Sequence, residues 1–296
     1  MNRTAVNPDV KQQAVESSPR TGVILLLVLV AGVWAVGMSH AQDVFRGEEG
    51  VKPYTHLSFQ NDPDEFQFAV MGDLTGGARS GVLPAAVDLL NLVRPEFVVN
   101  VGDLIEGYVE DEGQLKSWWK DVDDELDRLD MPFFFVPGNH DVNFDPSEKV
   151  WFERAGADRG YSHFVYKDVL FLLLSTEDPP KKQISEEMEE SYYRVKAGET
   201  TPAEAQAIIE ELEEWAGTVS ISDAQVEYFE KVLEANTEVR WTIGFMHSPA
   251  WAQPDPGNFA KIEARLAGRP YTMFAGHTHT YNYTYRNGHD YITMGM

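Results

Sequence analysis

The 296-residue sequence contains no cysteine. This absence excludes a disulfide framework, a thiolate zinc site and a cysteine nucleophile. Basic residues are also scarce, since 24 Lys and Arg stand against 48 Asp and Glu, and the formal net charge is −24. A surface with this balance repels the nucleic-acid backbone, so we expect no DNA or RNA partner. We interpret the acidity as an adaptation for solubility or salt.

The N-terminal segment is basic at first and then carries one uncharged apolar run, GVILLLVLVAGVWAVGM, at 22–38. The small residues Ser39 and Ala41 follow, as in a signal-peptide cleavage site. The run is long for a signal-peptide core and just long enough to span a bilayer. Residues 1–41 are therefore either a cleaved signal peptide or an uncleaved membrane anchor. Because the basic side stays in the cytoplasm, we expect everything that follows to be exported, to the periplasm or the cell exterior, with 42–65 as a linker.

Short apolar runs alternate with helical stretches from residue 66 onward. Most of these runs are almost continuously hydrophobic, as in strands that are covered on both faces. The pattern predicts a layered α/β domain over 66–296. The strand candidates are 66–71, 96–101, 132–137, 169–175, 240–246 and 271–276.

Several helices have recognisable start signals. Asp145 is a candidate N-cap, and two capping boxes pair Thr201 with Glu204 and Ser222 with Gln225. These signals predict helices that begin at or just after each cap.

Two segments depart from the alternation of strands and helices. Residues 178–220 are rich in glutamate, and we interpret them as a helical insertion that is either a lid over an active site or a solvated surface excursion. Near the end, the Asn287-Gly288 pair predicts a β-hairpin with a tight primed turn.

Side chains that can bind metal ions follow five of the predicted strands. In open α/β sheets, ligands bind beyond the carboxyl ends of the strands, so we expect these residues to converge on one crevice. Each one alone has a simpler explanation, because a Gly-Asp pair often only forms a turn and a single histidine often only fills a core. Together they are hard to explain by packing. The residues are Asp73, Asp103, Glu106, Asn139, His140, Asp141, His247, His277 and His279.

The sequence blocks around these residues are GDLTGG, GDLIEG, GNHD, a single histidine and GHTH. They resemble the calcineurin-like metallophosphoesterase family, whose signature runs D-x-H, GD-x-x-D/E, GNH-D/E, H and GH-x-H in that order. The resemblance covers about 66–296, and the GD-x-TGG first block is similar to that of exported bacterial members. It implies a four-layer α/β/β/α sandwich of two mixed β-sheets flanked by helices, around a two-metal site.

The resemblance also implies roles for the individual residues. Two divalent ions, of Mn, Fe, Mg or Zn, would lower the pKa of a shared water and hold the phosphate for in-line attack by a bridging hydroxide. Asp103 would bridge the two ions, since a carboxylate has enough lone pairs for both. The implied metal ligands are Asp73 and His279 for the first ion, Asn139, His247 and His277 for the second, and Asp103 for both.

Three further residues complete the implied catalytic set. His140 would protonate the leaving group as a general acid, Glu106 would orient that histidine, and Asp141 would assist. Arg79, in the loop after the first block, is a candidate phosphate contact, with a solvated loop arginine as the alternative.

The first block departs from the family pattern, because Thr75 stands where the second ligand is usually a histidine. The first metal would then have Asp73, Asp103 and His279, plus water or a weak hydroxyl contact. Loss of one imidazole weakens such a site and favours harder ions such as Mn, Mg or Fe. The chain also stops at YITMGM, where relatives of the family usually continue, which indicates a fragment with an incomplete sheet edge.

Two functions remain open from the sequence. The first is a metal-dependent hydrolase that acts on small phosphate mono- or diesters, and the second is a catalytically weak or inactive module of the same fold that works by binding. Retention of His140 and Asp103 favours the hydrolase, because a module without activity needs no general acid. The sequence does not identify the substrate or the oligomeric state.

Overall fold

Two β-sheets form the centre of the domain, and they contain all six of the predicted strands. In the larger sheet the order is β1-β5-β6-β7-β8-β10-β9; its middle pairs are parallel and its outer pairs antiparallel. In the smaller sheet, β2, β3 and β4 are parallel, and Tyr54 adds an antiparallel bridge to Phe134. The strands are β1 (Phe45–Gly47), β2 (Phe68–Met71), β3 (Phe97–Asn100), β4 (Phe133–Phe135), β5 (Ser162–Tyr166), β6 (Val169–Leu173), β7 (Trp241–Phe245), β8 (Tyr271–Ala275), β9 (Asn282–Arg286) and β10 (His289–Thr293).

The computed structural model describes residues 45–47, 54–57, 66–76, 79–180, 190–191, 193–195, 197–216 and 218–296. The predicted signal or anchor segment at 1–41 lies outside these residues, as does most of the predicted linker. Phe45–Met296 form one compact unit. Within the described part of the chain, none of the helices combines the length and the hydropathy needed to cross a membrane.

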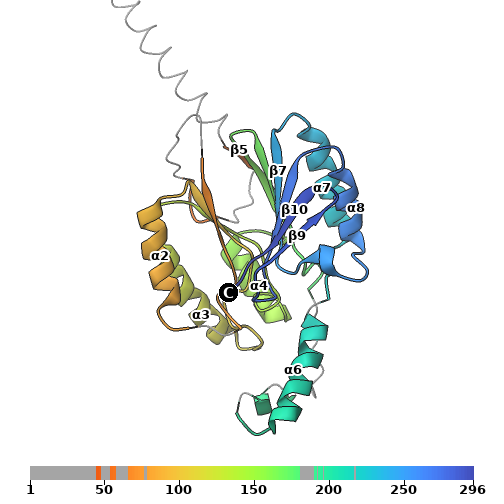
Figure 1. Ribbon diagram of the computed structural model, residues 1–296. Helices are drawn as coiled ribbons and strands as arrows, with labels where there is room; N and C mark the ends of the chain where they lie inside the picture. The colour runs from red at the N-terminus through yellow and green to blue at the C-terminus, as the bar shows by residue number, and fades with distance from the viewer. Residues whose placement is uncertain are drawn as a thin grey trace, which may run out of the picture. The chain divides into compact units, whose positions relative to one another are not determined.

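Helices cover the outer faces of both sheets. Side chains of α2, α3 and α4 pack on the smaller sheet, and those of α7 and α8 pack on the larger one. Figure 1 shows α2 and α3 on one side of the strands and α7 and α8 on the other. The predicted sandwich of helices around two sheets is therefore confirmed. The helices are α2 (Val82–Val93), α3 (Glu112–Leu126), α4 (Asp145–Ala155), α6 (Pro202–Ala216), α7 (Asp223–Ala235), α8 (Asn258–Arg265) and the short 3₁₀ helix η1 (Ala250–Ala252).

The two sheets pack against each other through aromatic side chains. The ring of Phe97 on β3 lies 5.2–5.6 Å from the rings of Phe134, Phe164 and Phe171, and it is fully buried. Phe164 stacks on Phe134 at 4.2 Å and on Phe171 at 4.6 Å. Because Phe97 and Phe134 come from the smaller sheet and the other two from the larger, this cluster joins the two sheets. Each such ring pair adds about 0.5–1.5 kcal/mol beyond the burial of its area.

The predicted start signals are confirmed for one helix and partly wrong for two. The Thr201–Glu204 box forms, with both reciprocal hydrogen bonds present. Ser222 accepts the N–H of Gln225 at 3.1 Å, but the Gln225 side chain pairs with the backbone of Ser175 instead of returning to Ser222. A buried amide partner in the core replaces the second half of that box.

The helix predicted to follow Asp145 has its N-cap one residue earlier than expected. Asp145 is the first helical residue, and Phe144 is the N-cap. The hydroxyl of Ser147 accepts the Phe144 N–H at 2.8 Å, so a serine in the first turn provides the cap. Strand β5 was not predicted, although Phe164, Val165 and Tyr166 are of residue types that are enriched in strands.

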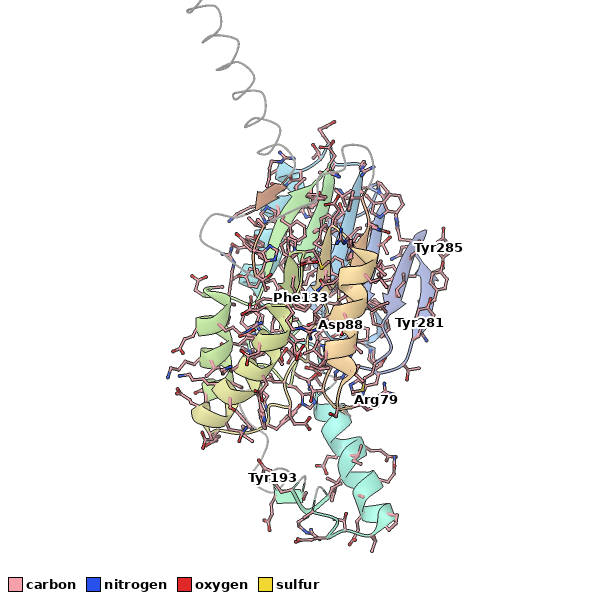
Figure 2. The ribbon with its side chains drawn as sticks, turned by 90° about the vertical axis from the view of Figure 1, so that its left-hand side faces the viewer. Arg79, Asp88, Phe133, Tyr193, Tyr281 and Tyr285 are labelled. Atoms are coloured by element: carbon pink, nitrogen blue, oxygen red, sulfur yellow. The ribbon has the colours of Figure 1, made fainter. Side chains whose placement is uncertain are left out.

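The predicted hairpin forms between β9 and β10. Asn287 and Gly288 have φ values of 53° and 82°, which is the pair of positive values that a type I′ turn requires. Tyr285 on the outer strand β9 and Tyr281, which lies just before that strand, are each 66% exposed (Figure 2).

The predicted insertion contains helix α6, and its two ends are joined at the base. Glu177 and Ser220 form a parallel bridge, and Ser220 exchanges backbone hydrogen bonds with Thr176 and Asp178. The hydroxyl of Tyr193, labelled in Figure 2, donates to the carbonyl of Tyr108 at 3.0 Å. The insertion therefore reaches a loop outside itself, while its role as a lid stays a prediction.

We expect Phe97→Ala to lower the free energy of unfolding by about 3–5 kcal/mol, because it opens a cavity between the two sheets. Chemical denaturation followed by circular dichroism measures the change. Leu92→Ala on α2 is the control, since that side chain is 79% exposed and its truncation should cost less than about 0.5 kcal/mol. Equal effects of the two substitutions would contradict the assignment of Phe97 to the inter-sheet core.

Candidate metal centre

The side chains of the candidate site follow the carboxyl ends of strands from both sheets. Asp73 follows β2, Asp103 follows β3, and Asn139 follows β4, while His247 follows β7 and His277 follows β8. Hydrogen bonds across the sheets bring these ends together: the N–H of His277 donates to Asp73 Oδ2 at 2.7 Å. The expected convergence on one edge is therefore present in the structure.

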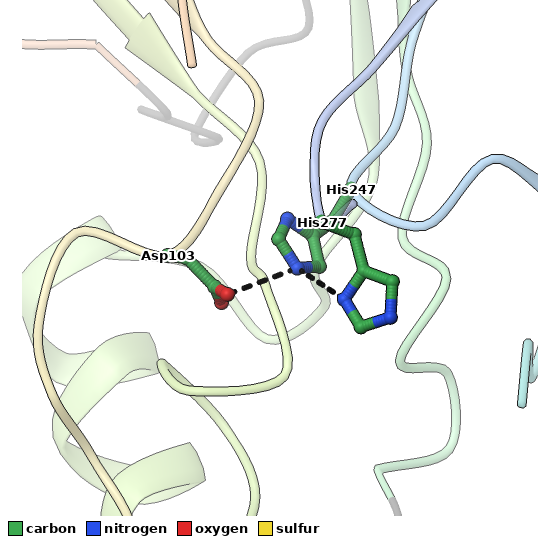
Figure 3. Close-up of side chains that lie close together, drawn as sticks. All are labelled: Asp103, His247 and His277. Atoms are coloured by element: carbon green, nitrogen blue, oxygen red, sulfur yellow. Dashed lines mark hydrogen bonds and ion pairs between the residues drawn. The ribbon is translucent and has the colours of Figure 1, made fainter. Parts of the chain in front are cut away.

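Three of these side chains form a compact cluster of donor atoms. Ligand atoms of Asp103, His247 and His277 all lie within 4.8 Å of one another. His247 Nε2 is 3.1 Å from Asp103 Oδ2 and 3.3 Å from His277 Nδ1. Dashed lines mark these two contacts in Figure 3. Asp103 and His247 are almost completely buried. Such a buried set of one carboxylate and two imidazoles is a suitable site for a divalent metal ion.

Asn139 adds an oxygen to this cluster. Its Oδ1 lies 2.9 Å from both His247 Nε2 and His277 Nδ1. Its amide nitrogen donates to the hydroxyl of Tyr108 at 2.8 Å, and this bond turns Oδ1 toward the cluster. The Nδ1–H of His247 must donate to the carbonyl of Val101 at 2.8 Å, because a carbonyl only accepts. In the neutral ring the lone pair of His247 therefore lies on Nε2 and points to the cluster, as metal binding requires.

Asp73 and His279 form a second group of donors. Asp73 Oδ2 is 3.2 Å from His279 Nε2. Asp73 Oδ1 is buried and has no hydrogen-bond partner among the described residues. An unpaired buried carboxylate oxygen is costly, and a cation would satisfy it.

Two glycines keep space next to the carboxylates. A Cβ added to Gly276 would lie 2.2 Å from Asp73 Oδ1, and one added to Gly138 would lie 2.1 Å from Asp103 Oδ1. Among the candidate ligands, Asp103, His277 and His279 have positive φ values of 58°, 70° and 52°. Non-glycine residues rarely adopt this backbone, and it is found preferentially at functional sites.

The carboxylates and histidines of the cluster shift one another's pKa values. Burial would lower the pKa of His247, but the neighbouring carboxylate of Asp103 outweighs burial and raises it to about 10. Burial would raise the pKa of Asp103, whereas His247 and His140 hold it below its ordinary value. The hydrogen bond to Asp73 raises the pKa of His279. A proton therefore sits where a metal ion would bind, and the carboxylate, amide and imidazole donors fit divalent Mn, Fe or Zn.

His140 lies next to this centre and is held by its neighbours. Its N–H donates to Asp103 Oδ1 at 2.9 Å, and its ring Nδ1 donates to the carbonyl of Glu106 at 2.6 Å. The ring of Tyr108 stands edge-on to it at 4.6 Å. The sequence predicts that Glu106 orients His140. The contact seen here runs through the main chain of Glu106, and its carboxylate accepts the hydroxyl of Thr75 at 2.5 Å.

Asp141 is completely buried and connects two loops. Its Oδ2 accepts the N–H groups of Asp103 and Gly138, and its Oδ1 accepts those of Leu104 and Ile105, at 2.8–3.3 Å. Burial and the nearby Asp103 raise its pKa to about 6. These contacts give Asp141 a role in positioning, and its predicted assistance to His140 stays a prediction.

The structure does not bring every predicted residue to the centre. Arg79 is exposed and lies before the start of α2 (Figure 2), and among the described residues no contact places its side chain against the candidate ligands. Tyr108 was missed by the sequence analysis, although it contacts both Asn139 and His140. Its only signal was an aromatic residue just after the GDLIEG block, and that gives no indication of where the ring points.

Comparison with known proteins identifies related folds. A family model described as calcineurin-like phosphoesterase matches residues 66–281. A dimetal phosphatase from Danio rerio is similar in structure, with 18% identity, 78% of this chain and 87% of that chain covered, and a TM-score of 0.57. No curated protein matches the chain.

Two further solved structures match with lower scores. The phosphopantetheinyl hydrolase from Mycobacterium tuberculosis is 15% identical in sequence. The match covers 77% of this chain and 89% of that chain, with a TM-score of 0.39. GAP50, the anchor in the inner membrane complex of Plasmodium, is 16% identical in sequence. The match covers 78% of this chain and 71% of that chain, with a TM-score of 0.43.

We expect metal binding to release protons. Below the unfolded-state pKa of histidine, protonated His247 beside Asp103 stabilises the metal-free protein, and this stability is lost as the pH rises through about 10. A metal ion must displace that proton, so its affinity should rise with pH over this window. Titration calorimetry in buffers of different ionisation enthalpy counts the protons. Metal binding without proton transfer to the buffer would contradict the protonated state of His247 in the metal-free protein.

Proposed function

The chain belongs to the calcineurin-like phosphoesterase family, and we propose that it hydrolyses small phosphate mono- or diesters with His140 as the general acid. The observation that carries the proposal is the meeting of Asp103, Asn139, His247 and His277 at one sheet edge, directly beside His140. Such an arrangement serves a reaction that needs both a cation and a proton donor.

The donor set divides into two groups, consistent with two divalent cations. Asp73 and His279 form one group and Asn139, His247 and His277 the other, with Asp103 as the proposed bridge. When bound, such ions supply an activated water and neutralise the charge that develops on the phosphate. Because the chain as a whole is acidic, attraction for a phosphate must arise locally at this centre.

His140 is suited to donate a proton to the departing oxygen. Its Nδ1–H is occupied by the carbonyl of Glu106, so Nε2 is the ring atom that remains for a substrate. The hydrogen bond from its own N–H to Asp103 keeps it close to the proposed bridging ligand. General acids placed in this way contribute about 10²–10⁴ to the rate.

The experiment that tests this function measures both metal content and turnover. The protein, supplied with manganese, iron and zinc, should contain about two metal ions per chain and hydrolyse p-nitrophenyl phosphate or its diester analogue. A chelator should abolish the activity. Bound metal without turnover of either ester would instead support the alternative, a module that acts by binding.

Two substitutions separate the metal centre from the proton donor. Asp103→Asn should lower both metal content and activity, since it removes the charge shared by the two groups. His140→Asn should keep the metal but lower kcat about 10²–10⁴-fold for esters with poor leaving groups. Leu92→Ala, far out on α2, serves as the control. Loss of metal in His140→Asn, or full activity in Asp103→Asn, would contradict the assigned roles.

We further propose that the domain works outside the cytoplasm, either anchored to the membrane by its N-terminal segment or released by cleavage of that segment. The support is the basic segment followed by the apolar run at 22–38. Cell fractionation of the full-length chain should place the domain outside the cytoplasmic membrane. Replacing three leucines of the run by arginine should retain the protein in the cytoplasm, whereas an unchanged distribution would contradict export.

A further inference from the structure

Thr75 replaces the expected histidine ligand, and the structure shows where its side chain goes. Thr75 is 2% exposed and follows β2. The N–H groups of Leu74 and Thr75 both donate to the carbonyl of Asp103, at 2.9 and 3.1 Å. The Thr75 hydroxyl donates to Glu106 Oε2 at 2.5 Å, across 31 residues of sequence. Backbone and side chain together therefore tie Thr75 to the loop that carries Asp103 and Glu106.

That loop holds the ring of His140 at two points. The Glu106 carbonyl accepts the Nδ1–H of His140, and the Tyr108 ring lies against it. Between them, Gly107 has a φ of 58° and passes so close that an added Cβ would lie 1.8 Å from the His140 carbonyl oxygen. Tyr108 also has a positive φ, of 53°. A backbone of this kind keeps its shape only when neighbouring groups hold it.

We propose that Thr75 is a positioning residue for the general acid: by holding the Glu106 side chain, it fixes the carbonyl that orients His140. This inference rests on the proposed function, because it assigns His140 the role of proton donor. Thr75 then acts through Glu106 and not as a metal ligand. The substitution of histidine by threonine in the first block exchanges a ligand of one metal for a support of the proton donor.

The hydrogen-bond geometry favours this role over metal binding. A neutral hydroxyl is a weak ligand compared with the carboxylates and imidazoles nearby. A hydrogen bond from a hydroxyl to a carboxylate is short and strong because the acceptor is charged, and here it is buried on the Thr75 side. The carboxylate of Glu106 is thereby drawn to the β2 loop, and the peptide unit after it faces His140.

The first test observes His140 directly and needs no catalysis. In the protein labelled with ¹⁵N-histidine and loaded with diamagnetic Zn²⁺, the Nδ1–H of His140 should give a protected signal, assigned by its loss in His140→Asn. Thr75→Val should weaken this signal through exchange with water, and Thr75→Ser, which keeps the hydroxyl, should restore it. An equally protected signal in Thr75→Val would overturn the proposal.

The second test uses the dependence of the rate on the leaving group. A proton donor matters for 2-glycerophosphate, whose alkoxide is a poor leaving group, and little for p-nitrophenyl phosphate. Thr75→Val should lower kcat for the alkyl ester about 10–100-fold and for the aryl ester at most about threefold, with metal content unchanged. Thr75→Ser should recover most of the loss. Thr284→Val, which removes a hydroxyl on β9, is the control.

The outcomes separate this inference from the proposed function. If Thr75→Val loses one metal ion and slows both esters equally, Thr75 is a ligand and the positioning role is wrong. If the wild-type protein hydrolyses neither ester, the proposed function fails, while the signal of His140 in the first test still decides whether Thr75 holds its loop.

Discussion

The buried carboxylate of Asp141 joins the two loops that carry most of the candidate site. It accepts four backbone N–H groups, from Gly138 in its own loop and from Asp103, Leu104 and Ile105 in the loop after β3. Each of these donors would otherwise be buried without a partner, at a cost of about 1–3 kcal/mol. The bonds also set the distance between Asp103 and the Asn139–His140 pair. The candidate ligands Asp103 and Asn139 thus keep their spacing before any metal ion binds.

The larger sheet contributes the three candidate histidine ligands, and charge explains why they meet the carboxylates of the smaller sheet here. Asp73 Oδ2 accepts the backbone N–H of His277, and Asp103 Oδ2 faces His247. In the absence of a cation, protons on histidine balance the carboxylates, which is why the pKa of His247 rises despite complete burial. The aromatic cluster around Phe97 holds the two sheets together below this edge. Packing therefore brings the strand ends together, and electrostatics defines what can occupy the space between them.

The sequence was sufficient to predict the features that depend on local pattern. All six predicted strands form, and the ligands at their ends converge, because buried strands and strand-end residues follow rules of periodicity and topology. Two of the missed features depend on contacts between residues far apart in the sequence. Tyr108, whose own φ is positive, contacts Asn139 and His140. The Gln225 side chain hydrogen-bonds to the buried backbone of Ser175 and not to Ser222, the cap residue with which it was predicted to pair. No periodicity indicates either contact, since each results from how a loop or a helix end meets the rest of the core.

Thr75 illustrates why a residue at a motif position cannot be read by its position alone. A histidine there would contribute to the centre with a lone pair, whereas threonine contributes a proton, and that proton goes to Glu106. The first group of donors keeps Asp73 with its unpaired Oδ1, and His279. The second group keeps four donors, among them the buried Asp103 and His247. The two donor groups are therefore unequal: the group next to His140 has four donors, whereas the group of Asp73 and His279 would need further oxygen ligands to hold an ion, which would favour a harder metal.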